Sequence, residues 1–247
     1  MIRILFSVVL CLIVPLQLQA AETPPVIEIF DCNYNSGQDR DDLDKAVDYW
    51  RGAMEDVEGS ENYFAAIFSP IRASSPYDLH WVGATANLNA WADYVSRYGG
   101  SSQGQASQAR FDKVVSCESN LFLSERVYSG SPIRPEDGQQ VAETYGCQLR
   151  HGKTMANLNA IEDAWTDAAA EIDSKVNVLR WTPLVANVEY DLIYVIVHDD
   201  LAAFAANNTA QFNSSALNIA GSLLNTVMEC KGGLYNVDVI QQPPAQE

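Results

Sequence analysis

The sequence predicts an α+β protein made of two copies of one βαββαβ unit arranged in tandem. Three observations support this prediction: residues recur at matched spacings along the chain, strand-like and helix-like patterns alternate within each copy, and each copy carries two cysteines. A chain of 247 residues is long enough for two such units, each with its own hydrophobic core.

The internal repeat is long and keeps its register. From the first matched cysteine to the first matched tryptophan the spacings are equal, and after a difference of two residues the match resumes and continues to the last cysteine. The offset of about 113 residues is far longer than a solenoid repeat, so each copy should be a small domain. The matched pairs include Cys32 and Cys147, Gly37 and Gly152, Leu43 and Leu158, Trp50 and Trp165, Tyr77 and Tyr190, Leu88 and Leu201, and Cys117 and Cys230.

Each element of the unit has its own pattern in the first copy. Residues 26–34 alternate and are rich in strand-forming side chains, which predicts a strand. Apolar residues between 43 and 57 recur at helical spacing, so they should share one face of a helix. The predicted order is a strand at 26–34, a helix across 43–57, strands at 64–69 and 78–84, a helix at 88–97 capped by Thr85 or Asn87, and a strand at 114–127.

The order of elements predicts how the cysteines pair. When the last strand of a βαββαβ unit lies antiparallel beside the first, the unit has the ferredoxin-like arrangement. Cys32 lies late in the first strand and Cys117 early in the last, so neighbouring strands would bring them to disulfide distance. Cys147 and Cys230 hold the same places in the second copy. Four cysteines formally allow three connectivities, of which we predict Cys32–Cys117 and Cys147–Cys230.

Two ferredoxin-like βαββαβ units in tandem resemble the dimeric α/β-barrel superfamily. This superfamily includes small antibiotic-biosynthesis-type monooxygenases and chlorite-dismutase-like haem proteins. The resemblance covers nearly all of the mature sequence and implies that two sheets pack face to face around a shared central space within one chain. It rests on element order and duplication. No motif is present whose functional residues could be transferred, and the four cysteines depart from the usual cytosolic members.

The start of the chain resembles a secretory signal peptide. Arg3 precedes an apolar stretch that ends at Leu16, and the small residue Ala20 stands at the presumed cleavage site. An N-terminal membrane anchor is the alternative, but the apolar stretch is short for a bilayer. We therefore expect a periplasmic or secreted protein. The expected segments are a signal peptide at 1–20, a first repeat at 21–128, a linker at 129–140, a second repeat at 141–241 and a tail at 242–247.

The protein is strongly acidic. Its formal charge is −17, and loss of Arg3 with the leader would make it −18. Such a surface should repel nucleic acid and anionic membranes, so neither is an expected partner. The even number of cysteines in the mature chain argues for disulfides formed in an oxidising compartment.

Metal and cofactor sites are not predicted. The chain has three histidines, and none is matched by a histidine in the other copy, which excludes a duplicated metal site. Haem is the one cofactor considered, with His80 or His198 as its ligand, although neither histidine lies in a recognisable haem motif. The run Gly152-Lys153-Thr154 fails the spacing of a phosphate-binding loop and is interpreted as the turn into a helix.

The candidate ligand-binding residues are mostly aromatic and lie on predicted strands. If one sheet face looks into a central space, these residues would line it, and the arginine and histidines would supply polarity. Ordinary core packing is the alternative, although an arginine in an apolar strand needs a partner if it is buried. The candidates are Phe68, His80, Trp81, Arg180, Trp181, Tyr194 and His198.

These features favour an exported protein that binds a small apolar or aromatic ligand between its two repeats without catalysis. One alternative is a dimeric α/β-barrel enzyme, either a cofactor-independent monooxygenase or a haem-dependent enzyme. The other is a structural scaffold for protein contacts. Function is expected where the copies differ, at His80, Arg180 and His198.

Overall fold

The computed structural model describes residues 23–130 and 140–243. The predicted signal peptide at 1–20, most of the predicted linker and the end of the predicted tail lie outside the described residues. Among the described residues, no helix has both the length and the apolar character needed to cross a membrane.

Each half of the chain contains four strands, and in each half two helices in a row precede the last strand. The first half consists of β1 (Val26–Tyr34), α1 (Arg40–Met54), the short 3₁₀ helix η1 (Ser60–Asn62), β2 (Phe64–Arg72), β3 (Leu79–Thr85), α2 (Leu88–Gly100), α3 (Ser102–Val114) and β4 (Val115–Ser129). The second half consists of β5 (Gln140–Leu149), α4 (Met155–Glu171), β6 (Asn177–Val185), β7 (Leu192–His198), α5 (Leu201–Asn213), α6 (Ser215–Val227) and β8 (Met228–Gln241).

The helices α3 and α6 correct the predicted βαββαβ order to βαββααβ. A serine starts each of them, since Ser101 accepts a hydrogen bond from the Gly104 N–H and Ser214 accepts one from the Leu217 N–H. Helix α3 was missed because it is polar, and it packs through small residues rather than through an apolar stripe. Its buried residues are Gly104, Ser107 and Val114.

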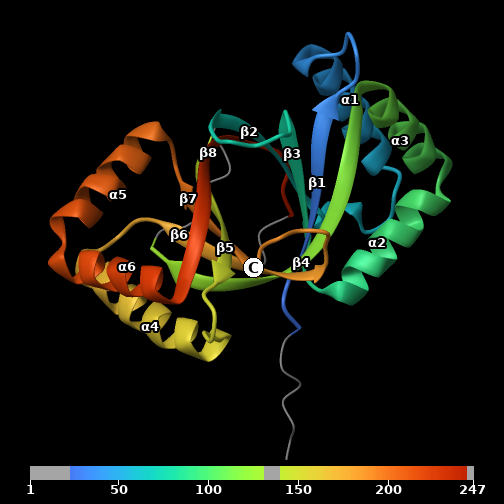
Figure 1. Cartoon of the computed structure of the whole chain (residues 1–247). Coiled ribbons are helices and arrows are strands. Elements are labelled where there is room, and N and C mark those ends of the chain that lie inside the picture. The colour runs from blue at the N-terminus through green and yellow to red at the C-terminus, as the bar shows by residue number, and fades with distance from the viewer. Residues whose placement is uncertain (1–22, 131–139, 244–247) are drawn as a thin grey trace, which may run out of the picture.

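The strands form one closed antiparallel barrel. Within the described residues the strand order around the ring is β1-β3-β2-β8-β5-β7-β6-β4. The strands of each half lie together in this ring, and the halves join where β2 pairs with β8 and β4 pairs with β6. Helices α1 to α3 cover the outside of one half and α4 to α6 cover the outside of the other (Figure 1). The two groups of strands therefore face one another across a shared interior.

The barrel interior is a hydrophobic core to which every strand contributes. In a strand, successive side chains point to opposite faces, so one set points inward and the other points toward the helices. The inward set from both halves forms one cluster: Ile27, Ile29, Ala66, Phe68, Val82, Phe122, Ala142, Trp181, Val195, Tyr235 and Val237. Separate cores lie between each half of the barrel and its own helices. The interior expected to hold a ligand is thus packed with side chains.

The turn before the first helix of each half has the same design. Gly37 and Gly152 have φ angles of 79° and 77°, a left-handed conformation that glycine adopts without steric cost. The helices then begin after the caps Asp39 and Thr154. The run Gly152-Lys153-Thr154 is therefore a turn into α4, as predicted.

Both predicted disulfides are present. Cys32 lies directly opposite Cys117 in the β1–β4 ladder, and Cys147 lies opposite Cys230 in the β5–β8 ladder. The sequence separations are 85 and 83 residues, so each bond closes a long loop. In the chain-entropy model each should stabilise the fold by about 4 kcal/mol.

We expect loss of either disulfide to lower the free energy of unfolding by about 4 kcal/mol, since the unfolded chain gains the freedom of a long loop. The variants are Cys32→Ala with Cys117→Ala, and Cys147→Ala with Cys230→Ala, compared with the parent by urea unfolding. A loss below about 1 kcal/mol in both double variants would contradict this account.

Candidate functional site

The seven candidate residues do not line one common space, because they point to both faces of the strands. Phe68 and Trp181 point into the barrel interior. Trp81 and Tyr194 point toward the helices of their own halves. The expectation that all four line one cavity is therefore wrong. The reason is the register: Trp81 pairs with Ile67 and not with Phe68, so the two aromatic side chains fall on opposite faces.

Arg180 is buried on the helix side of β6, where its two terminal nitrogens have hydrogen-bond partners and its Nε has none among the described residues. Its side chain is 7% exposed, and its Nη1 donates to Glu162 Oε2 on α4. Its Nη2 lies 2.5 Å from Glu125 Oε2 on β4. The Tyr194 hydroxyl donates to Glu162 as well. This network ties α4 to the sheet, so Arg180 is a structural residue.

We expect Glu162→Gln to destabilise the fold by about 3 kcal/mol, because it leaves the Arg180 guanidinium buried without its best-shielded partner. Glu125→Gln is the matched control. The side chain of Glu125 is 64% exposed, so its loss should cost less than about 1 kcal/mol. Chemical unfolding of both variants checks the difference, and equal losses would show that burial does not decide the strength of the two pairs.

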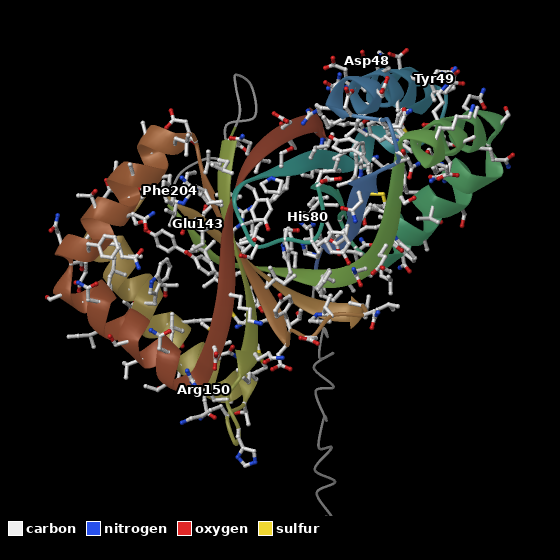
Figure 2. The ribbon with its side chains drawn as sticks, turned by 45° about the horizontal axis from the view of Figure 1, so that its top comes forward. Asp48, Tyr49, His80, Glu143, Arg150 and Phe204 are labelled. Atoms are coloured by element: carbon white, nitrogen blue, oxygen red, sulfur yellow. A yellow bond between two sulfur atoms is a disulfide. The ribbon has the colours of Figure 1, made fainter. Side chains whose placement is uncertain are left out.

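His198 also lies on the helix side, in the second half. Its Nε2 is 3.0 Å from Glu143 Oε1, and its Nδ1 is 3.1 Å from the Asn207 side-chain nitrogen. Figure 2 shows Glu143 and Phe204 on this side of the strands, and the Phe204 ring packs edge-on against the imidazole. With both ring nitrogens bonded and 1% of its side chain exposed, His198 is closed to a ligand.

A cavity of about 340 Å³ lies in the first half, between the barrel wall and helices α1 to α3. It falls within the range of about 300–1,000 Å³ that is usual for small-molecule sites. Near Glu143 and His198, the cavity on the helix side of the second half measures only about 20 Å³. Aromatic rings dominate the wall of the large cavity: Phe30, Trp50, Tyr63, Trp81, Tyr94, Tyr98 and Phe111.

The wall is held by contacts between the rings themselves. Tyr63 stacks on Tyr94 with ring centroids 4.1 Å apart, and Tyr94 stacks on Tyr98 at 5.8 Å. Trp81 meets Trp50 edge-on at 5.2 Å. Burial raises the pKa of the Tyr94 and Tyr98 hydroxyls, so both stay protonated and keep a hydrogen-bond donor.

Gly83 makes room for the stacked tyrosines. A Cβ at this position would lie 1.8 Å from the Tyr63 hydroxyl oxygen, so any larger residue would displace the Tyr63 ring. The matching residue of the second half is Ile196, which packs into the helix-side core there. The two halves therefore share a backbone plan and differ in whether the space under the helices is open.

Glu28 brings a carboxyl group to this cavity. Burial raises its pKa, and the indole of Trp91 partly opposes that effect. The Trp91 Nε1 has no hydrogen-bond partner of ordinary geometry among the described residues. The matching carboxylate in the second half is Glu143, which is bonded to His198. The first half has Thr85 in place of that histidine, so Glu28 has no basic partner at this position.

The cavity does not suit haem ligation by the residues considered from the sequence. His80 points into the barrel interior and His198 lies in the other half, so neither contributes to the wall. The cysteines of the wall, Cys32 and Cys117, are joined in a disulfide. In the described part of the chain, no group of three or more His, Cys, Asp or Glu side chains is placed to hold a metal ion.

No protein-family model matches the sequence, and no curated protein matches it. Solved structures do resemble it. A Fusobacterium nucleatum protein assigned as a monooxygenase has a TM-score of 0.58 at 8% identity, with 90% of this chain and 94% of that chain covered. An anthrone oxidase-like protein has a TM-score of 0.53 at 13% identity, covering 92% and 98%. A mutant chlorite dismutase from Candidatus Nitrospira defluvii has a TM-score of 0.52 at 13% identity, covering 89% and 94%.

These structures confirm the fold that the resemblance to the dimeric α/β-barrel superfamily implied, because each matches nearly the whole chain. The protein has the dimeric α/β-barrel fold. At such low identities the likeness shows the fold alone, and function must be argued from the site.

Sequence reasoning found one residue of the cavity wall, Trp81, and missed the rest. A signal was present for two of the others. Tyr94 and Tyr98 are four residues apart, and Tyr98 directly follows the helix predicted at 88–97, so a helix one residue longer would place both on one face. The matched pair Glu28 and Glu143 was also visible, as a charge repeated inside an apolar strand.

Proposed function

We propose that the protein binds a small, largely aromatic molecule in the cavity of the first half. The observation that carries this proposal is the cavity of about 340 Å³ walled by aromatic rings, whereas the cavity near His198 in the second half measures about 20 Å³. Stacked and edge-on aromatic contacts favour planar ligands. The site lies between the barrel wall and the helices, whereas the sequence suggested the space between the two repeats.

Glu28 gives the proposed site its polar specificity. A partly buried carboxyl whose pKa burial raises gains most from a ligand group that donates a hydrogen bond to it. The tyrosine hydroxyls of the wall can donate to an acceptor on the same ligand. We therefore propose an aromatic ligand that carries a hydroxyl or amine group. Such a molecule would fill the apolar space and satisfy Glu28 together.

We expect 2-naphthol, used as a probe, to quench the tryptophan fluorescence of the protein, since Trp50 and Trp81 line the cavity. Val95→Trp should weaken binding at least about 10-fold, because Val95 lines the cavity and a larger side chain there would fill it. Ser96→Trp is the matched control: its position is exposed on the same helix and is absent from the wall. Equal affinity in the two variants, or no quenching in the parent, would contradict the proposal.

We expect Glu28→Gln to stabilise the protein relative to the parent, and more so at pH 7 than at pH 4. The folded carboxyl has a pKa above its ordinary value near 4.5, so its stabilising protonated form is complete below that value and is lost as the pH rises through the folded pKa. Glutamine keeps the neutral form at every pH. Urea midpoints at both pH values check this, with the exposed Glu55→Gln as control. An advantage that shrinks with rising pH would contradict it.

A second candidate function is oxygenation of the bound aromatic molecule without a cofactor. Glu28 favours it, because a carboxylate in an apolar cavity can accept a proton from an activated carbon or hydroxyl group of a ligand. The names of the neighbours, a monooxygenase and an anthrone oxidase-like protein, point the same way. Oxygen consumption with anthrone, lost in Glu28→Gln while anthrone binding persists, would identify the enzyme. Binding without oxygen consumption would identify a carrier.

We also propose that the chain is exported to the periplasm or the medium. Two disulfides support this location, because such bonds form and persist in oxidising compartments. The signal-like start of the chain agrees with it.

A further inference from the structure

A second polar site lies at the end of the barrel where the β2–β3 turn crosses it, on the opposite face of the wall from the aromatic cavity. His80 is its centre, and Figure 2 shows His80 among the strands of the barrel. Its Nδ1 is 2.5 Å from Asp31 Oδ1 on β1, and its Nε2 is 3.4 Å from the Ser75 hydroxyl oxygen in the turn. Ser75, His80 and Asp31 are thus joined by consecutive side-chain hydrogen bonds, with His80 in the middle.

The order of these contacts sets the role of each atom. A carboxylate beside Nδ1 favours the imidazole tautomer that carries its proton on Nδ1. Nε2 then holds a lone pair, and the Ser75 hydroxyl donates to it. The Tyr77 backbone N–H donates to the Ser75 oxygen at 3.1 Å and fixes the side chain in the turn. A Ser to His distance of 3.4 Å is within the looser range of sites without substrate.

The aspartate is held by a further layer of hydrogen bonds. Asn120 on β4 is 5% exposed and donates to Asp31 Oδ2 at 3.0 Å. The Asn120 side-chain oxygen accepts from the Asn187 backbone N–H of the second half at 2.9 Å. The rings of Tyr77 and Tyr235 lie edge-on to His80 at 6.0 Å and 5.4 Å. The imidazole is therefore oriented from several sides.

The fold does not require this cluster, because the second half builds the same strands and turn without it. There the space is packed: a Cβ on Gly146 would lie 2.7 Å from the Tyr190 ring. The residues that match Asp31, Ser75, His80 and Asn120 are Gly146, Val188, Ile193 and Gly233. All four polar members are thus particular to the first half.

We propose that Ser75, His80 and Asp31 form a nucleophilic site that hydrolyses small carboxylic esters. The side chains of His80 and Asp31 are 17% and 16% exposed, and Ser75 is partly buried in its turn, so a small acyl group can reach the hydroxyl. The arrangement matches the roles of a Ser-His-Asp triad, which recurs on unrelated folds. The site is independent of the aromatic cavity and of the function proposed for it.

Each step balances. The Ser75 oxygen bonds to the ester carbonyl carbon while its proton passes to His80 Nε2, and Asp31 stabilises the imidazolium. The bond from the acyl carbon to the alcohol oxygen breaks, and the alcohol leaves with the proton from Nε2. Water then attacks the acyl-serine and gives a proton to Nε2. Release of the carboxylic acid returns that proton to the serine oxygen.

The test uses the full-length protein with two probes, p-nitrophenyl acetate and a fluorophosphonate. The fluorophosphonate should give one phosphonylated peptide that contains the modified Ser75. Ser75→Ala and His80→Gln should each lower kcat/KM for the ester at least ~100-fold. Ser74→Ala is the matched control, since Ser74 is the exposed neighbour in the same turn and should keep the parent rate.

Asp31→Asn separates catalysis from structure. The substitution preserves the shape of the side chain and can favour the wrong tautomer of His80, so kcat for the ester should fall. The thermal unfolding midpoint and the circular dichroism spectrum should stay close to those of the parent. Three results would overturn the proposal: no phosphonylation of Ser75, equal phosphonylation in His80→Gln, or ester hydrolysis unchanged in Ser75→Ala. Any of these would make the cluster a structural hydrogen-bond network at the end of the barrel.

Discussion

The pairing of β2 with β8 and of β4 with β6 holds the two halves in one closed sheet. Without these two ladders each half would be a four-stranded sheet with two open edges and one uncovered apolar face. With them, every strand has two neighbours, and side chains from both halves fill a common interior. Closure removes the exposed edges that invite aggregation. The positions of the cavity and of the polar site both follow from it, because it decides which strand face looks inward.

The two halves share one order of strands and helices but differ in the side chains that lie between the strands and the helices. In the first half, Gly83 admits the Tyr63 ring and the space beneath α2 stays open. In the second half, Ile196 joins the core, and the polar residues Arg180 and His198 are bonded to glutamates. The helix-side space is thus filled by Ile196 and by paired charges in the second half, whereas in the first half it forms the aromatic cavity. Of the three residues at which the sequence argument expected function, Arg180 and His198 are bonded to glutamates, and His80 belongs to the site proposed above.

The strands were predicted well because period-two alternation is a local signal. Both disulfides were predicted because the order of elements places the last strand of each half beside its first. The strand at 26–34 agrees with β1 at both ends. Helix α3 was missed because small residues such as Gly104 and Ser107 pack there and leave no apolar stripe. Helix α6 was missed with it, although α6 buries the apolar residues Leu217, Ala220 and Val227. It was harder still to predict which side chains of each strand point into the barrel and which point toward the helices. Trp81 and Phe68 look alike in sequence, and only the pairing register places one under the helices and the other inside the barrel. The Asp31 to His80 contact depends on the same cross-strand register.

The strand order also decides when the barrel can close during synthesis of the chain. The outer edge of β2 pairs with β8, and the outer edge of β4 pairs with β6. Both edges of the first half are therefore unpaired when this half leaves the ribosome. The last of these partners to be synthesised is β8, which spans Met228–Gln241. Pairing over such long separations in sequence is intrinsically slow. The barrel can therefore close only after β8 has been made, and a chain that lacks this strand would leave the edge of β2 free to pair with another molecule.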